Sequence, residues 1–258
     1  MATDTAARKF GMVLALTALA VGGCSSGGSD RADPVRLEVA TAQGEYPWTG
    51  LLVPAQVPVA VPPPPRDAVE DTGDPVAASG GGPPAVAGDR TALYGGSLDR
   101  QLCDRRELVD TLASDPVKAD AWRGVLNVTD LREYIRSLTP VLLRADTRVT
   151  KHEYRAGEAR PVQAVLESGT VVLVDDRGVP RVRCVRGNPL SAPVLATKSD
   201  LEGPEWPGLD PERLFIVQAA AEPVKELKVV DITTGELLPI PIGAGLQPPA
   251  PEPDKPPT

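Results

Sequence analysis

Apolar residues recur at helical spacing between residues 104 and 139, which predicts three short helices in succession. Asp104 is the expected N-cap of the first, because Glu107 follows three residues later. Asp115 and Pro116 predict the start of the second helix, which would run to about residue 126. Thr129 is the expected cap of the third, which would stop before Pro140. The expected buried positions are Leu108, Val109, Leu112, Ala119, Trp122, Leu126, Leu131, Tyr134, Ile135 and Leu138.

Outside this region apolar and polar residues alternate along several short segments, which predicts β-strands. One short strand is expected within 34–53, where Val35, Leu37 and Val39 alternate with Arg36, Glu38 and Ala40. The other expected strands cover 141–150, the segments of 163–184 on either side of breaks at 168–169 and 176–178, and 214–219, 227–232 and 237–242. A turn is expected at 155–161. Helices and strands are segregated along the chain, so we predict an α+β fold: a mostly antiparallel sheet with a small cluster of three short helices on one side or end.

Proline marks the boundaries of the predicted domain. Residues 54–90 contain PPPP and SGGGPP, and 244–258 are also rich in proline, so both are expected to be disordered, as a linker and a tail. The remaining 34–53 plus 91–243 are predicted to form a single α+β domain.

The first residues have the composition of a bacterial export signal. Arg8 and Lys9 precede an apolar stretch over 10–21 that is too short to span a bilayer. The segment VGGC, which ends at Cys24, resembles the lipobox, whose cysteine receives the lipid. We therefore expect a signal peptide at 1–23, lipidation of Cys24, a polar tether at 24–33 and a location on the extracytoplasmic face of the cell membrane. The alternative is an ordinary secretory signal followed by a chance cysteine.

The charge of the chain restricts its partners. The formal net charge is −8 at pH 7. An acidic chain lacks the basic surface that neutralises phosphates, so we expect no nucleic-acid partner. It also lacks a polybasic segment for anionic lipid, so contact with the membrane would depend on the covalent anchor.

Several segments together resemble the actinobacterial lipoproteins grouped as domain-of-unknown-function family 6777. They are VRLEVATAQGEYPWTG, CDRRELVDTLASDPVKADAWRGVL, LTPVLLRADTRVTKHEYRAGEARPVQAVLESGTVVLVDDRGVPRVRCVRGNPL, WPGLDPERLFIVQ and VVDITTGELLPIPIG. The resemblance covers nearly all of 34–243 and implies an extracytoplasmic module, without an activity. The chain departs from the family at one point: it has Arg186 where the family pattern C-x-C-G-N-P-L has a second cysteine after Cys184.

The residues that could support catalysis are few, so we expect no enzyme, no cofactor and no metal. His152 is the single histidine, and any His-based triad would have to use it. Asp175 and Asp176 could form a carboxylate pair, but Arg177-Gly178 follows, so a solvated hairpin turn is the preferred interpretation. No P-loop, G-x-S-x-G or H-E-x-x-H motif is present. The tryptophans, Trp48, Trp122 and Trp206, are expected to be core or turn anchors.

Two cysteines remain once Cys24 carries lipid. Cys103 and Cys184 are expected to form a disulfide, because an exported chain meets an oxidising environment. Such a bond would join the entry of the first helix to the end of a strand before a turn at 187–189. Two buried free thiols are the alternative.

By elimination, the sequence favours a noncatalytic, lipid-anchored envelope module that binds an envelope protein or a cell-wall component. The alternative is a lipoprotein that binds a small ligand for transport or sensing. A deep apolar cleft with converging polar groups would favour that second function.

Overall fold

The computed structural model describes residues 1, 34–54, 83–194 and 200–244. The expected signal peptide, Cys24 and the tether lie outside the described residues, as do most of the expected linker and all but the first residue of the tail. Within the described part of the chain, no helix is long and apolar enough to cross a membrane.

The described residues contain three α-helices, and an aspartate directly before each one caps it. They are α2 (Arg105–Ala113), α3 (Pro116–Leu126) and α4 (Leu131–Ser137). The carboxylates of Asp104 and Asp115 accept hydrogen bonds from the backbone amides three residues later, as the sequence predicts. The third cap differs from the prediction: Asp130, not Thr129, accepts the hydrogen bond from the Glu133 amide, at 2.8 Å. Both residues suit a cap, but Glu133 follows Asp130 by three residues, the spacing that Glu107 has after Asp104, so the local pattern favours Asp130.

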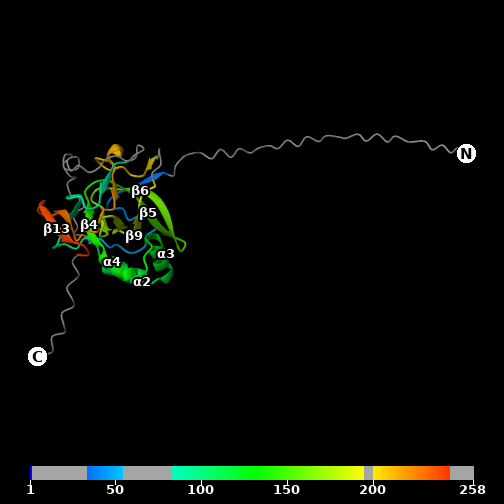
Figure 1. The fold of residues 1–258 in the computed structure, drawn as a ribbon, viewed down its shortest axis with the longest axis horizontal. Coiled ribbons are helices and arrows are strands. Elements are labelled where there is room, and N and C mark those ends of the chain that lie inside the picture. The colour runs from blue at the N-terminus through cyan, green and yellow to red at the C-terminus, as the bar shows by residue number, and fades with distance from the viewer. Residues whose placement is uncertain (2–33, 55–82, 195–199, 245–258) are drawn as a thin grey trace, which may run out of the picture. The chain divides into compact units, whose positions relative to one another are not determined.

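Most strands of the described residues join one sheet of eleven strands, in the order β10-β1-β6-β5-β9-β8-β7-β4-β3-β12-β13. Figure 1 labels β4, β5, β6, β9 and β13 of this sheet, with α2, α3 and α4 gathered on one side. Their bounds are β1 (Val35–Glu38), β3 (Tyr94–Gly96), β4 (Thr139–Leu143), β5 (Thr147–Arg155), β6 (Glu158–Leu166), β7 (Val171–Val174), β8 (Pro180–Arg183), β9 (Asn188–Ser191), β10 (Leu201–Glu202), β12 (Glu226–Asp231) and β13 (Leu237–Pro241). Most pairs are antiparallel, whereas β1 runs parallel to β6 and β10, and β3 parallel to β12. The predicted α+β class is confirmed.

The predicted strand over 141–150 is two strands, β4 and β5, separated at residues 144–146. The polar groups of this break have distant partners. The Asp146 carboxylate accepts from the Ser168 amide at 2.8 Å and from the Trp206 indole at 3.0 Å, and Arg144 donates to the Ala92 carbonyl at 2.7 Å. These long-range hydrogen bonds stabilise a bend that the alternating pattern does not reveal.

The predicted linker range, 54–90, extends too far toward the C-terminus, because residues 85–87 form a strand. This strand, β2 (Ala85–Ala87), pairs in parallel with β11 (Ile216–Gln218), far along the chain. Just beyond β2, Gly88 crosses the turn between β7 and β8 so closely that a Cβ on Gly178 would lie 2.0 Å from the Gly88 carbonyl oxygen. The two segments can cross this closely because each has a glycine, without a Cβ, at the contact. A short helical turn, η1 (Pro211–Arg213), precedes β11.

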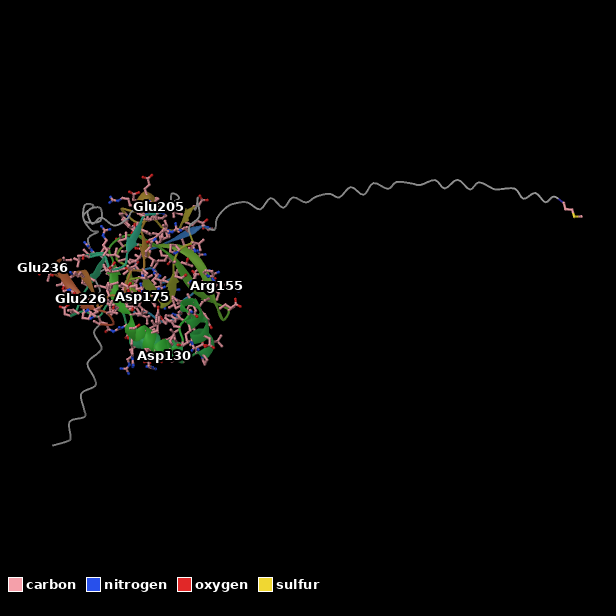
Figure 2. All side chains as sticks on the ribbon, in the orientation of Figure 1. Asp130, Arg155, Asp175, Glu205, Glu226 and Glu236 are labelled. Atoms are coloured by element: carbon pink, nitrogen blue, oxygen red, sulfur yellow. A yellow bond between two sulfur atoms is a disulfide. The ribbon has the colours of Figure 1, made fainter. Side chains whose placement is uncertain are left out.

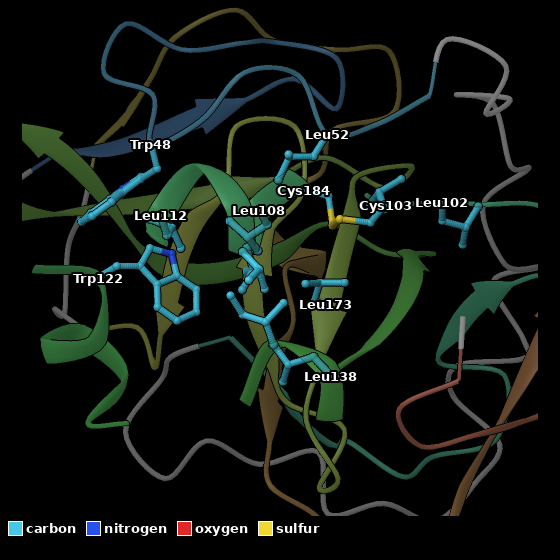
Figure 3. Packing of buried hydrophobic residues seen from close by; sticks show 14 of the residues in the cluster. Trp48, Leu52, Leu102, Cys103, Leu108, Leu112, Trp122, Leu138, Leu173 and Cys184 are labelled. Carbon is cyan, nitrogen blue, oxygen red and sulfur yellow. A yellow bond between two sulfur atoms is a disulfide. The ribbon is translucent and has the colours of Figure 1, made fainter. Parts of the chain in front are cut away.

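The sheet carries apolar residues on both faces, and adjacent residues of β4 belong to different clusters. Leu142 packs with the helices in one cluster, whereas Val141 and Leu143 join the other. Figure 3 shows the helix-side cluster, in which the Cys103–Cys184 disulfide lies among the aliphatic side chains. A third, smaller cluster packs Trp206 against β1 and β6. This burial on both faces explains the continuous apolar runs of β4 and β7.

Candidate functional site

A group of charged side chains lies on β1, β5 and β8, mostly out of solvent. We call it the charge cluster; it consists of Arg36, Glu38, Lys151, Glu153, Arg155 and Arg183. Strand geometry brings these residues together, because alternate residues of a strand share a face. Strands β1 and β5 both pair with β6, which places the two sets of alternating charges on the same side of the sheet.

The inner part of the cluster is a buried group of two cations and two carboxylates that form ion pairs. Lys151 donates a hydrogen bond to the Glu38 carboxylate, and its Nζ lies 3.3 Å from Glu153 Oε1. Arg183 is fully buried, with Nη1 at 3.5 Å from Glu38 Oε2. Its Nη2 donates to the carbonyls of Val39 and Ala42, at 2.9 and 2.8 Å. Charges that leave water need such partners, so this group fixes β1 and the following loop to the sheet.

Two arginines form the outer part, where the cluster reaches solvent. Arg36 Nη1 lies 3.4 Å from Glu153 Oε1, and Arg155 Nε donates to Glu153 Oε2 at 3.0 Å. The Arg155 guanidinium also stacks 3.7 Å from the ring centre of Tyr46. Arg155 is at the molecular surface beside the tip of the β5–β6 hairpin (Figure 2). The two arginines therefore contact the same buried carboxylate, Arg36 at Oε1 and Arg155 at Oε2.

Burial and pairing act in opposite directions on the acidity of the cluster. Burial alone raises the pKa of Glu153, but hydrogen bonds from Arg155 and Lys151 and their positive charges outweigh it, and the pKa is lowered from its ordinary value of 4.5. Burial lowers the pKa of Arg183, and the neighbouring Glu38 opposes this shift.

We expect the stability of the domain to fall in acid because of Glu153. Its folded pKa lies below the unfolded one, so its contribution is complete above about pH 4.5 and is lost as the pH falls through the lowered folded pKa. Glu153→Gln should flatten the acid side of a plot of unfolding free energy against pH. Glu158→Gln, in an exposed pair with Arg160 on the same hairpin, is the control. An acid limb equally steep in Glu153→Gln and the parent would contradict this assignment.

His152 lies on the opposite face of β5 from Lys151. Its Nε2 is 3.0 Å from the Ser191 hydroxyl, and burial lowers the pKa of the imidazole. Its backbone carbonyl accepts hydrogen bonds from the Trp48 indole and the Asn188 amide, at 2.8 and 2.9 Å. Among the hydrogen bonds of the described residues, no carboxylate contacts the imidazole, so the third member of a triad is absent from this part of the chain.

The turn after β7 forms the predicted hairpin with β8, and Asp176 is exposed there, but the side chain of Asp175 is largely out of solvent. Its side chain is 14 % exposed and receives hydrogen bonds from the amides of Arg177 and Val179 and from Arg181 Nε. The Asp176 carbonyl accepts from the Val224 amide at 2.8 Å. Segments distant in sequence also pack on this turn, so its local polarity predicts the hairpin but not the enclosure of Asp175.

The tryptophans are core residues, as predicted. Trp48 and Trp122 are fully buried and Trp206 nearly so. Trp122 donates its indole N–H to the Gly187 carbonyl at 3.0 Å, so each of the three indoles has a hydrogen-bond acceptor.

A disulfide joins Cys103 to Cys184, with Cα atoms 5.8 Å apart. Cys184 directly follows β8, but Asn188 and Pro189 belong to β9, so the turn is earlier than the predicted 187–189. Arg186, which departs from the family pattern, donates through Nη1 to the Thr49 carbonyl at 3.3 Å and through Nη2 to Gln43. It thus contacts the segment after β1.

The described residues offer neither a metal-binding group nor a deep ligand cleft. Within the described ranges, no group of three or more His, Cys, Asp or Glu residues could hold a metal ion. A shallow hollow between α2 and the start of α4 is open to solvent and mixes apolar and charged side chains. It is lined by Val109, Ala113, Arg123, Thr129, Asp130, Leu131 and Arg132. Its openness distinguishes it from the deep cleft that a small-ligand carrier would need.

The described residues form an α+β domain with a mostly antiparallel sheet, an internal disulfide and a buried charge cluster. The chain belongs to the family described as domain of unknown function DUF6777, which matches residues 84–243. No curated protein and no solved structure matches the chain. Strand β1 precedes the matched range, so Arg36 and Glu38 complete the charge cluster from outside it.

The charge cluster is the part of the site that the sequence pattern did not indicate. Glu38 was expected on the polar side of an alternating strand, and Lys151 and Glu153 only as neighbours of His152. Their burial follows from β8 and from the loop after β1. A signal was present in the alternation of opposite charges at positions 36 and 38 and at 151 and 153, but it equally suits an exposed strand face.

Proposed function

We propose that the protein is a lipid-anchored module on the extracytoplasmic face of the bacterial envelope, where it binds an envelope component without catalysing a reaction. The lipobox-like segment that ends at Cys24 carries the proposal, because the apolar stretch over 10–21 would direct export and the thiol that follows would take the lipid anchor. The buried disulfide supports an oxidising compartment, where such bonds form and persist. The resemblance to actinobacterial lipoproteins supports the same location.

The architecture supports binding more than catalysis. The charged groups with the most unusual environment are locked in ion pairs with one another, and His152 hydrogen-bonds to Ser191 without a carboxylate among its described contacts. The fixed attachment of β1 also suits an anchored module. If the anchor precedes residue 34, then β1 is the first described strand after it, and β1 is bonded to β6 and β10 on its two sides.

Replacing Cys24 with alanine should abolish the membrane anchor. The expected product is an uncleaved precursor or protein released into the medium, because the lipid is attached through this thiol. Each buried methylene contributes about 0.8 kcal/mol to membrane partitioning, so losing two acyl chains removes nearly all of the affinity. Detergent-phase partitioning and the mass of the mature N-terminus measure both effects. Ser25→Ala is the matched control and should behave as the parent; an unchanged membrane fraction of Cys24→Ala would refute the anchor.

A further inference from the structure

The charge cluster contains more positive than negative side chains. Its buried part is balanced, because Lys151 and Arg183 face Glu38 and Glu153. The two outer arginines, Arg36 and Arg155, share Glu153 with Lys151, so no carboxylate of the cluster is left to neutralise them. We call these two residues the arginine pair.

The arginine pair is both accessible and oriented. The side chains of Arg36 and Arg155 are 44 % and 36 % exposed, whereas that of Glu153 is 3 % exposed.

 Both guanidinium groups contact the Glu153 carboxylate, one at each oxygen, so they lie close together. Stacking on Tyr46 orients Arg155, and Arg36 makes one contact, at 3.4 Å, among the described residues. Donor groups of both arginines are therefore left for a further acceptor.

The surroundings favour a single anionic group over an extended one. Glu45, exposed in the loop after β1, is the acidic residue whose charge acts on Arg155 from outside the cluster. The whole chain carries a net charge of −8, so a long polyanion is repelled elsewhere on the surface. A guanidinium presents two parallel N–H donors, which match the oxygens of a carboxylate or a phosphate.

We propose that Arg36 and Arg155 form a binding site for one oxyanion, a phosphate or carboxylate group carried by an envelope component. The envelope source rests on the proposed function, whereas binding of the oxyanion itself does not. The buried Glu153 carboxylate holds the two arginines in place, and the bound oxyanion accepts hydrogen bonds from their solvent-exposed guanidinium nitrogens. The charge cluster thus has two roles: its buried half fixes β1, and its outer half recognises the ligand.

Titration of the purified full chain, kept in detergent, with inorganic phosphate or with acetate at constant ionic strength tests this site. Saturable shifts of backbone amide resonances are expected at residues 36 and 153–155. Arg36→Gln should weaken the affinity about tenfold, as expected for the loss of one charge-assisted contact. Arg160→Gln, which removes an exposed arginine from the same hairpin, should leave it unchanged. Glu45→Gln should strengthen binding a few-fold, since it removes the opposing charge.

Each outcome bears on the proposal. Saturation by phosphate alone assigns the site to phosphate groups, and saturation by acetate as well assigns it to carboxylates too. Absence of saturable shifts with both anions overturns the proposal, as does an equal affinity in Arg36→Gln and the parent when the remaining spectrum is unchanged. If Arg36→Gln fails to fold, Glu45→Gln decides: an unchanged or weaker affinity in that variant overturns the site. The titration does not depend on membrane attachment, so its failure is distinguishable from failure of the Cys24→Ala test.

Discussion

Replacing Lys151 with methionine is expected to lower the free energy of unfolding by about 3 kcal/mol, the order seen when one partner of a buried ion pair is removed. Lys151 is 2 % exposed and bonds to the carboxylates of Glu38 and Glu153. Methionine fills a similar volume but removes the cation that the two buried carboxylates share, which leaves Glu38 with Arg183 at 3.5 Å and Glu153 with its two outer arginines. Chemical denaturation at neutral pH, followed by far-UV circular dichroism, measures the change.

A double variant separates the charge effect from the packing effect. Glu38→Gln removes one of the carboxylates that Lys151 pairs, so the cost of Lys151→Met should be smaller in the Glu38→Gln background, by about 1 kcal/mol or more. Arg160→Met, on the exposed part of β6, is the control and should cost less than about 1 kcal/mol. Strict additivity of the two cluster substitutions would show that Lys151 and Glu38 are not energetically coupled.

Removing the disulfide is expected to cost about 4 kcal/mol, an upper figure from the chain-entropy model. Cys103 and Cys184 are 81 residues apart in sequence, so the bond closes a large loop of the unfolded chain. Both residues also belong to the helix-side core cluster. The variant Cys103→Ala/Cys184→Ala, compared with the parent by denaturant titration, gives the difference. Since domains have a total stability of about 5–15 kcal/mol, the variant should lose a large share of its stability and unfold at a much lower denaturant concentration than the parent.

A thiol count provides the control for this experiment. The parent, unfolded without reductant, should show no thiol from Cys103 or Cys184. Both sulfurs lie in buried residues, at 3 % and 0 % exposure, so reductant should act on the folded protein only slowly. Two free thiols from these residues in the parent, or a difference in unfolding free energy below about 1 kcal/mol, would contradict the structural role of the bond.

Local signals determined the helices and several strand boundaries. Asp104 and Asp115 cap helices because a short acceptor side chain before a turn satisfies an amide three residues later, and that relation lies within a few residues of sequence. The turns that end β6 and β7 and join β12 to β13 follow from glycine and polar residues in the same local way. The pairing of Cys103 with Cys184 followed from counting cysteines in a chain expected to be exported, rather than from geometry.

Only the tertiary structure decided the charge cluster and the position of β2. Ala85–Ala87 resembles the end of a proline-rich linker until β11 lies beside it, because a three-residue strand is stable only through its partner. Glu38, Lys151 and Glu153 are ordinary polar positions until β8 and the loop after β1 exclude water from them. The energetic meaning of a charge depends on its desolvation and its partners, and both are set by contacts between segments more than 100 residues apart.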